Sequence, residues 1–102
     1  MTRLTQAQVD DRLDQLVQWT QSGDSIQRTF LFKDFVEAMK FVNVVAQEAE
    51  RNKHHPDILV RWNKVTLTLS THDAGGITEK DLNFAAAADK LGPAPTPSKK
   101  AK

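Results

Sequence analysis

The sequence predicts an α+β domain of two layers, in which three helices pack on one face of a four-stranded antiparallel sheet. Three observations lead to this prediction. A long amphipathic segment in the middle of the chain has helical periodicity, two pairs of short apolar runs are separated by turn residues, and a shorter helical segment lies near each end. Strands joined by short turns pair as antiparallel hairpins, so the expected order of elements is α-β-β-α-β-β-α.

A helix and a hairpin are expected in the first third of the chain. Thr5 and Gln8 have capping-box spacing, and apolar residues continue at helical intervals up to Leu16. Two strands are expected over residues 17–20 and 25–32, with a turn between them. Arg28 falls on the apolar face of the second strand, which indicates either a β-bulge or a sheet that is partly covered on both faces.

The longest helix is expected over Asp34–Asn52. Asp34 is a favourable N-cap, and the segment after it carries a broad apolar stripe at helical spacing. Pro56 disfavours the α conformation at His55, so this helix should end at or before that residue.

A second hairpin is expected over residues 58–71, followed by a third helix over residues 78–91. In the second strand of the hairpin, apolar residues alternate with threonine and serine, and His72 continues the side that bears the hydroxyls. Thr78 is the expected N-cap of the helix, and Asp81 stands where a capping box places its acidic member.

The composition indicates one domain, expected over residues 1–92, followed by a disordered tail rich in proline and lysine over residues 93–102. The sequence has no cysteine, which excludes disulfides, thiol catalysis and cysteine-ligated zinc. The N-terminus is polar and no apolar run approaches the ~20 residues that span a bilayer, so a cytoplasmic protein with no membrane partner is expected. A net charge of +1, from 14 basic and 13 acidic residues, gives no electrostatic case for nucleic-acid binding.

All three histidines lie in one stretch between Glu50 and Asp81. His54 and His55 close the long helix and His72 closes a strand, so three interpretations compete: solvated structural residues, a metal site, or a centre of acid–base chemistry. Adjacent histidines of an extended chain point in different directions and no H-x-x-x-H pair exists, so no metal is expected. Imidazole gives and takes protons near neutral pH, which permits acid–base chemistry if the histidines meet in one pocket.

A rare combination of residues stands at fixed spacing around the histidines: Glu50, His54-His55-Pro56, Trp62, His72 and Asp81. In these residues, in the F-x-F-K-D-F run over residues 30–35 and in the L-S-T-H segment over residues 69–72, the chain resembles the pterin-4a-carbinolamine dehydratases. The resemblance extends over residues 16–91. One departure is the turn between Trp19 and Ile26, which is shorter than in the animal members of the family.

The resemblance implies an activity. The expected reaction removes water from a 4a-hydroxytetrahydropterin and gives the quinonoid dihydropterin, a step in tetrahydrobiopterin recycling that uses no metal or organic cofactor. Expelling hydroxide from a carbinolamine needs a proton donor, and forming the C=N bond needs the removal of a proton from a ring nitrogen. Imidazoles can do both.

The resemblance also implies roles for individual residues. His54 and His72 are expected to transfer the protons, and His55 to position the substrate. Further substrate contacts are expected from the following residues: Trp19, Ser70, Thr71 and Asp81. For Trp19 a place in the core, and for Asp81 a capping role in the third helix, are equally expected. Trp62 is expected to pack and not to react, and Glu50 to make a contact at the helix end.

The family implies partners as well. We expect a homodimer or homotetramer that forms through an unpaired strand edge or the polar sheet face. A functional link to the aromatic amino acid hydroxylase that produces the carbinolamine is also expected. Two alternatives stay open at this point. One is a protein-interaction module, of the dimerisation-cofactor or transcriptional co-regulator type, with a vestigial pterin pocket. The other is a pterin-related role near molybdopterin metabolism.

Overall fold

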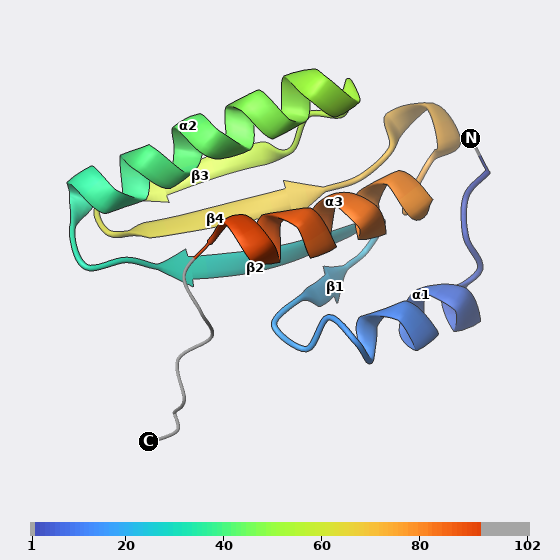
Figure 1. Cartoon of the computed structure of the whole chain (residues 1–102). Coiled ribbons are helices and arrows are strands. Elements are labelled where there is room, and N and C mark those ends of the chain that lie inside the picture. Colours follow the sequence, from blue (N-terminus) through green and yellow to red (C-terminus); the bar gives the residue numbers. More distant parts are fainter. Residues whose placement is uncertain (1, 93–102) are drawn as a thin grey trace.

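The computed structural model describes residues 2–92, and the tail expected over residues 93–102 lies outside them. The elements are α1 (Gln6–Leu13), β1 (Thr20–Ser22), β2 (Ser25–Leu31), α2 (Phe35–Asn52), β3 (Asp57–Arg61), β4 (Lys64–Leu69), the short 3₁₀ helix η1 (His72–Ala74) and α3 (Glu79–Leu91). The predicted order α-β-β-α-β-β-α is thereby confirmed (Figure 1). Among the described residues, none of the helices combines the length and the apolar character that crossing a bilayer requires.

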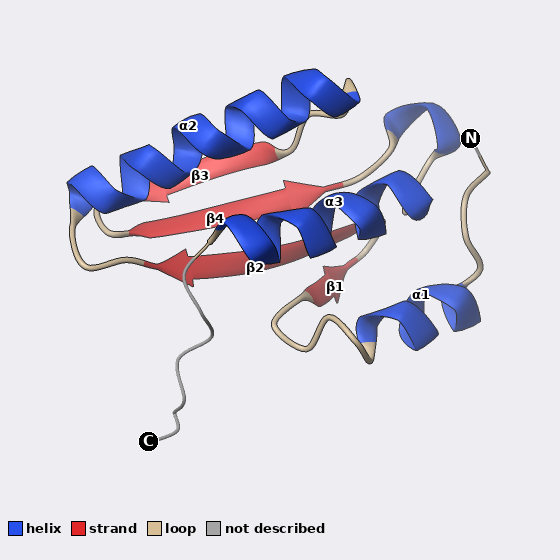
Figure 2. Ribbon diagram, viewed as in Figure 1, coloured by secondary structure: helices blue, strands red, loops and turns tan. Residues whose placement is uncertain are grey.

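The strands form one antiparallel sheet of four strands in the order β1-β2-β4-β3. Helices α2 and α3 run across one face of this sheet, and α1 lies beside its β1 edge (Figure 2). The covered face supplies fully buried side chains to the core: Ile26, Phe30, Val65, Leu67 and Leu69. Val9 of α1 belongs to the same core, so the helices and the covered face of the sheet enclose a single hydrophobic core.

Arg28 lies on the covered face of β2, and a buried ion pair accounts for it. Strands β2 and β4 pair residue by residue over residues 26–31, so the β-bulge considered from the sequence is wrong. Within the described part of the single chain, the side chains of β2 on the opposite face are exposed. The Arg28 side chain is 7% exposed, and its Nη1 donates to Asp89 Oδ1 of α3 at 2.5 Å. Trp19 Nε1 donates to the same oxygen at 2.9 Å.

Side-chain caps begin the three helices where the sequence predicts them. The side-chain oxygens of Thr5, Asp34 and Thr78 accept hydrogen bonds from N–H groups of the first turn. At its other end α2 stops at Asn52, because Lys53 turns the chain with a left-handed φ of 52°. This end lies before His55, as the proline argument predicted.

Two elements near the N-terminus differ from expectation. Helix α1 ends at Leu13, and the residues up to Leu16 form tight turns in which Leu16 N–H donates to Leu13 O at 3.0 Å. These turns still bury the Leu16 side chain, which is why the apolar spacing resembled a longer helix. Strand β1 occupies Thr20–Ser22 and not residues 17–20, because Val17 faces solvent at 77% exposure.

The end of β4 shapes the region of the histidines. The strand ends at Leu69, earlier than the expected end at Thr71. Thr71 N–H instead donates to Gly76 O at 2.9 Å and closes a small loop around η1, in which Gly75 adopts a left-handed φ of 75°. His72 therefore begins a 3₁₀ turn and does not continue the hydroxyl side of the strand.

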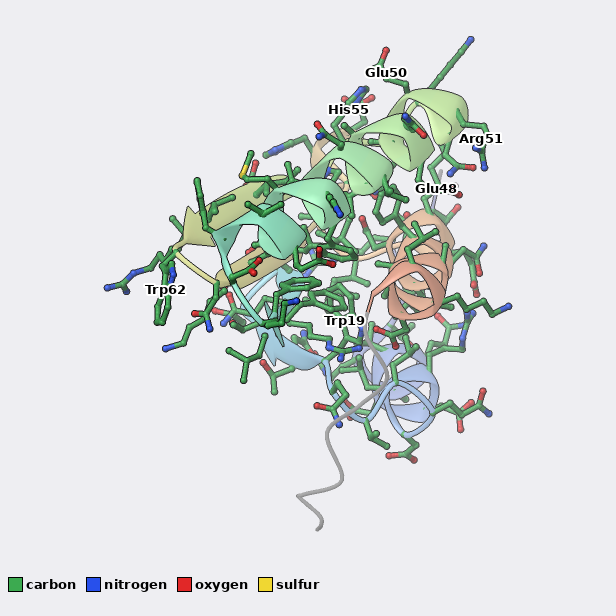
Figure 3. All side chains as sticks on the ribbon, turned by 60° about the vertical axis from the view of Figure 1, so that its left-hand side comes forward. Trp19, Glu48, Glu50, Arg51, His55 and Trp62 are labelled. Atoms are coloured by element: carbon green, nitrogen blue, oxygen red, sulfur yellow. The ribbon has the colours of Figure 1, made fainter. Side chains whose placement is uncertain are left out.

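Trp62 occupies the two-residue turn between β3 and β4. Its side chain is 69% exposed, so the expectation that it packs is wrong for the chain as described. Figure 3 shows Trp62 projecting outward, whereas Trp19 lies in the interior. Within residues 2–92, the adjoining strand β3 pairs with β4 alone, and its Ile58 and Leu59 are 37% and 55% exposed. One edge of the sheet is therefore open and partly apolar.

Candidate functional site

His54 and Asp81 form the buried centre of the site. His54 follows the left-handed turn that ends α2, and its backbone N–H donates to Ala49 O at 3.1 Å, which fixes its place at the helix terminus. Its Nε2 lies 2.5 Å from Asp81 Oδ1 in the first turn of α3. The His54 side chain is 10% exposed and Asp81 is fully buried. Residues 27 positions apart are thus joined where two helix ends meet.

The second oxygen of Asp81 serves the helix cap. Asp81 Oδ2 accepts the backbone N–H of Thr78 at 2.9 Å, which completes the capping box at the start of α3. The same oxygen accepts the Thr71 hydroxyl at 2.8 Å. The two functions considered for Asp81, a contact with a histidine and a helix cap, are therefore combined in one carboxylate.

His55 has a separate carboxylate partner outside the core. Its Nε2 lies 2.6 Å from Glu50 Oε2, and the two side chains are 62% and 78% exposed. Figure 3 shows Glu50 and His55 together at the end of α2. The contact that was expected for Glu50 at the helix end is thus a pairing with His55, in a position that water can reach.

An open cleft of about 320 Å³ brings the three histidines together. The end of α2, the loop after β4 and the start of α3 supply its lining: Lys53, His54, His55, Ser70, Thr71, His72, Asp73 and Lys80. This volume is at the lower end of the range for small-molecule sites, which is about 300–1,000 Å³. A smaller cavity of about 180 Å³ between α2 and α3 adjoins it, and His54 and Lys80 line both.

Several predicted substrate contacts are already engaged within the protein. Ser70 Oγ donates to Asp24 O at 2.9 Å, and the Thr71 hydroxyl is turned toward Asp81. Trp19 is 3% exposed in the core and does not line the cleft. Asp81 lies behind His54 and is fully buried. The structure therefore gathers five of the seven predicted residues around the cleft, places Asp81 in support of them and leaves Trp19 elsewhere.

Three charged residues that line the cleft were not expected from the sequence: Lys53, Asp73 and Lys80. Each is a neighbour in sequence of a predicted residue, since Lys53 precedes His54, Asp73 follows His72 and Lys80 precedes Asp81. This adjacency is the signal that could have found them. The two lysines and the one aspartate give the open part of the cleft an excess of positive charge.

Comparison with known proteins gives a consistent result. The family model for pterin 4 alpha carbinolamine dehydratase matches residues 2–91. A protein of Picosynechococcus sp. is 48% identical over 90 residues, which cover 88% of this chain and 98% of that protein. A protein of Roseiflexus sp. is 49% identical over 90 residues, which cover 88% of this chain and 97% of that protein. Both carry the name "Putative pterin-4-alpha-carbinolamine dehydratase".

Solved structures with the same fold include a transcriptional coactivator/pterin dehydratase from Brucella melitensis. This structure has a TM-score of 0.86 at 34% identity, with 90% of this chain and 100% of that chain covered. A pterin dehydratase-like protein that is a RuBisCO assembly factor in the alpha-carboxysome shares the fold, with a TM-score of 0.60 at 24% identity over 72% of this chain and 84% of that chain. On the strength of the family model and of these relatives, the chain belongs to the pterin-4a-carbinolamine dehydratase family.

Proposed function

We propose that this protein dehydrates a 4a-hydroxytetrahydropterin to the quinonoid dihydropterin. The observation that carries the proposal is the cleft in which His54, His55 and His72 converge on one space of small-molecule size. Membership in the family supplies the substrate class. The carbinolamine would come from an aromatic amino acid hydroxylase, which forms it as it oxidises its pterin cofactor.

The chemistry needs two proton transfers, and the proposal assigns them to His54 and His72. One group protonates the departing hydroxyl, so that it leaves as water, and the other accepts the proton lost from the ring nitrogen as the C=N bond forms. Neither transfer requires a redox step, and imidazole can act in both directions at neutral pH. His55, held by Glu50 at the rim, would position the pterin.

Replacing His72 with alanine is expected to lower kcat by about 10²-fold or more, because one of the two proton-transfer groups is lost. The measurement is the rate of quinonoid dihydropterin formation from freshly generated 4a-carbinolamine, corrected for the uncatalysed rate. His72 is exposed, so the variant should remain folded, which thermal unfolding checks. Asn43→Ala, at an exposed position of α2, is the control and should leave the rate unchanged.

The same assay separates the enzyme from the interaction-module alternative. A module with a vestigial pocket predicts that the wild type and His72→Ala both match the uncatalysed rate, and that result would overturn the proposal. The similar protein from Brucella melitensis is described as both a transcriptional coactivator and a pterin dehydratase, so the alternative has a precedent among similar proteins. The convergence of all three histidines on one cleft supports the enzyme, because an adaptor has no use for such an arrangement.

We also propose that a second copy of this chain covers the open β3 edge. An exposed strand edge beside apolar side chains favours pairing with another strand, and Leu59 lies on this edge at 55% exposure. Light scattering is expected to give at least twice the monomer mass. Leu59→Lys should lower that mass, while Val17→Lys, an equally apolar exposed position away from the edge, should not. A monomer mass for the wild type at working concentration contradicts this proposal.

A further inference from the structure

We infer that Thr71 is a positioning residue: with Thr78 it forms a directed hydrogen-bond chain that holds Asp81 and fixes the His54 ring with its proton on Nε2. The nitrogen left to exchange a proton with the substrate is then Nδ1. This inference deepens the proposed dehydratase function and rests on it for its catalytic meaning. Its structural content concerns only hydrogen bonds that the protein makes with itself.

The contacts of Asp81 indicate that it is ionised. Three groups approach its two oxygens: the Thr78 N–H at 2.9 Å, the Thr71 hydroxyl at 2.8 Å and the His54 ring nitrogen at 2.5 Å. An ionised carboxylate accepts hydrogen bonds only, and it can accept all three. With Asp81 as the acceptor of all three contacts, the hydrogen between its Oδ1 and the ring is carried by His54 Nε2. Asp81 therefore acts as a buried anion that is fully satisfied by donors.

The threonine hydroxyls donate in one direction. Thr71 has one hydroxyl hydrogen, and it is committed to Asp81 Oδ2. The 2.8 Å contact between the Thr71 and Thr78 hydroxyls must then have Thr78 as its donor. Thr78 Oγ1 in turn accepts the Lys80 N–H at 3.2 Å. The hydrogen-bond chain runs from the Lys80 N–H through the hydroxyls of Thr78 and Thr71 to the Asp81 carboxylate, and each hydrogen bond polarises the next.

The His54 ring has one nitrogen that is free of this network. Because Nε2 donates to Asp81, the neutral ring has its lone pair on Nδ1. Among residues 2–92, the buried side-chain nitrogen and oxygen atoms without a partner are Arg28 Nε and Asn63 Oδ1, so His54 Nδ1 is not sealed in the interior. His54 also lines the cleft. Nδ1 is therefore the atom through which the ring can exchange a proton.

The hydrogen-bond chain also changes the expectation that Thr71 contacts the substrate. Its hydroxyl donates to Asp81 and accepts from Thr78, which uses its hydrogen and one of its two lone pairs. The Thr71 hydroxyl thus has no hydrogen left with which to bind a pterin. Its effect on the reaction should run through the orientation of His54, and this separates a positioning role from substrate binding.

The first test reads the tautomer of His54 directly. Nitrogen-15 correlation spectra of the imidazoles, recorded above the pH range in which they titrate, should show the His54 proton on Nε2 in the wild type. A proton on Nδ1 overturns the inference whether or not the protein is a dehydratase. In Thr71→Val, which keeps the shape of the side chain but removes the hydroxyl, the signal should shift toward a mixture of both tautomers.

The second test is kinetic. Thr71→Val is expected to lower kcat by about tenfold, the usual effect of losing a hydrogen bond to a charged group, with KM within about twofold of the wild type. Thr71→Ser, which restores the hydroxyl, should recover most of kcat. A raised KM with unchanged kcat would mean that Thr71 binds substrate, and a Thr71→Ser variant as impaired as Thr71→Val would mean a packing role; both results contradict the inference.

The matched control is Thr66→Val. Thr66 and Thr29 also share a hydroxyl–hydroxyl contact, at 2.7 Å, but on the exposed face of the sheet and away from the cleft. Removing the Thr66 hydroxyl should change neither kcat nor the His54 tautomer. If Thr71→Val does not fold, the tautomer of His54 in the wild type and the kcat of Thr71→Ser still test the inference. If the wild type has no dehydratase activity, the proposed function fails while the tautomer measurement judges the hydrogen-bond chain by itself.

Discussion

Replacing His54 with glutamine is expected to lower kcat for carbinolamine dehydration by about 10²–10⁴-fold, the usual contribution of a general acid or base. The terminal amide of glutamine can place an N–H near the position of Nε2 and donate to Asp81, so the buried carboxylate keeps its partner. The amide cannot exchange a proton at neutral pH. Stopped-flow measurement of kcat and KM with freshly generated 4a-carbinolamine checks the prediction.

His55→Gln is the matched comparison for this experiment. The same substitution is made at the neighbouring histidine, whose Nε2 partner is Glu50 and whose side chain is 62% exposed. We expect KM to rise and kcat to fall by less than about tenfold, because an exposed pairing contributes little and His55 is proposed to position the substrate. Equal losses of kcat in the two variants would contradict the assignment of proton transfer to His54.

The second large effect is expected in stability. Asp89→Ala removes the partner of Arg28, which is 7% exposed, and the acceptor of Trp19 Nε1. Losing one member of a buried ion pair costs about 3–5 kcal/mol. Because the Asp89 side chain is itself 28% exposed, water can replace part of the interaction, so we expect a loss near the lower end, about 3 kcal/mol. Urea unfolding followed by circular dichroism measures the free energy of unfolding.

An exposed ion pair provides the control for Asp89→Ala. Arg3 and Asp24 are 3.1 Å apart with side chains 57% and 66% exposed. Asp24→Ala should change the free energy of unfolding by no more than about 1 kcal/mol. Comparable losses for Asp24→Ala and Asp89→Ala would mean that burial of the Arg28–Asp89 pair adds nothing to the free energy of unfolding, which contradicts the prediction.

The fold could be predicted because its decisive signals are local. The caps at Thr5, Asp34 and Thr78 act within the first turn of their helices, and the alternation of β4 is visible along six consecutive residues. The placement of Arg28 could not be predicted, because it depends on a residue that is distant in the sequence. Arg28 looked anomalous because its partner, Asp89, is 61 positions away, and no periodicity reports such a pairing.

The residues of the candidate site could be predicted from the sequence, but the hydrogen bonds between them could not. The histidines and Asp81 stood out as a rare combination at fixed spacing. That Asp81 would use one oxygen for His54 and the other for Thr71 and Thr78 depends on how α2, α3 and the loop after β4 meet. The exposure of Trp62 could not be predicted either, because the sequence pattern around an aromatic residue at a turn is the same whether its side chain is buried or exposed.

The double use of Asp81 has a dynamic consequence. When the first turn of α3 opens in a local fluctuation, the Thr78 N–H leaves Oδ2, and the carboxylate that orients His54 is released in the same event. Such local openings have free energies anywhere between zero and that of global unfolding. Hydrogen exchange at the Thr78 amide would then follow the same equilibrium as the fraction of molecules with an ordered His54. The protection factor of the Thr78 amide would therefore also report how often the His54 ring loses its orientation.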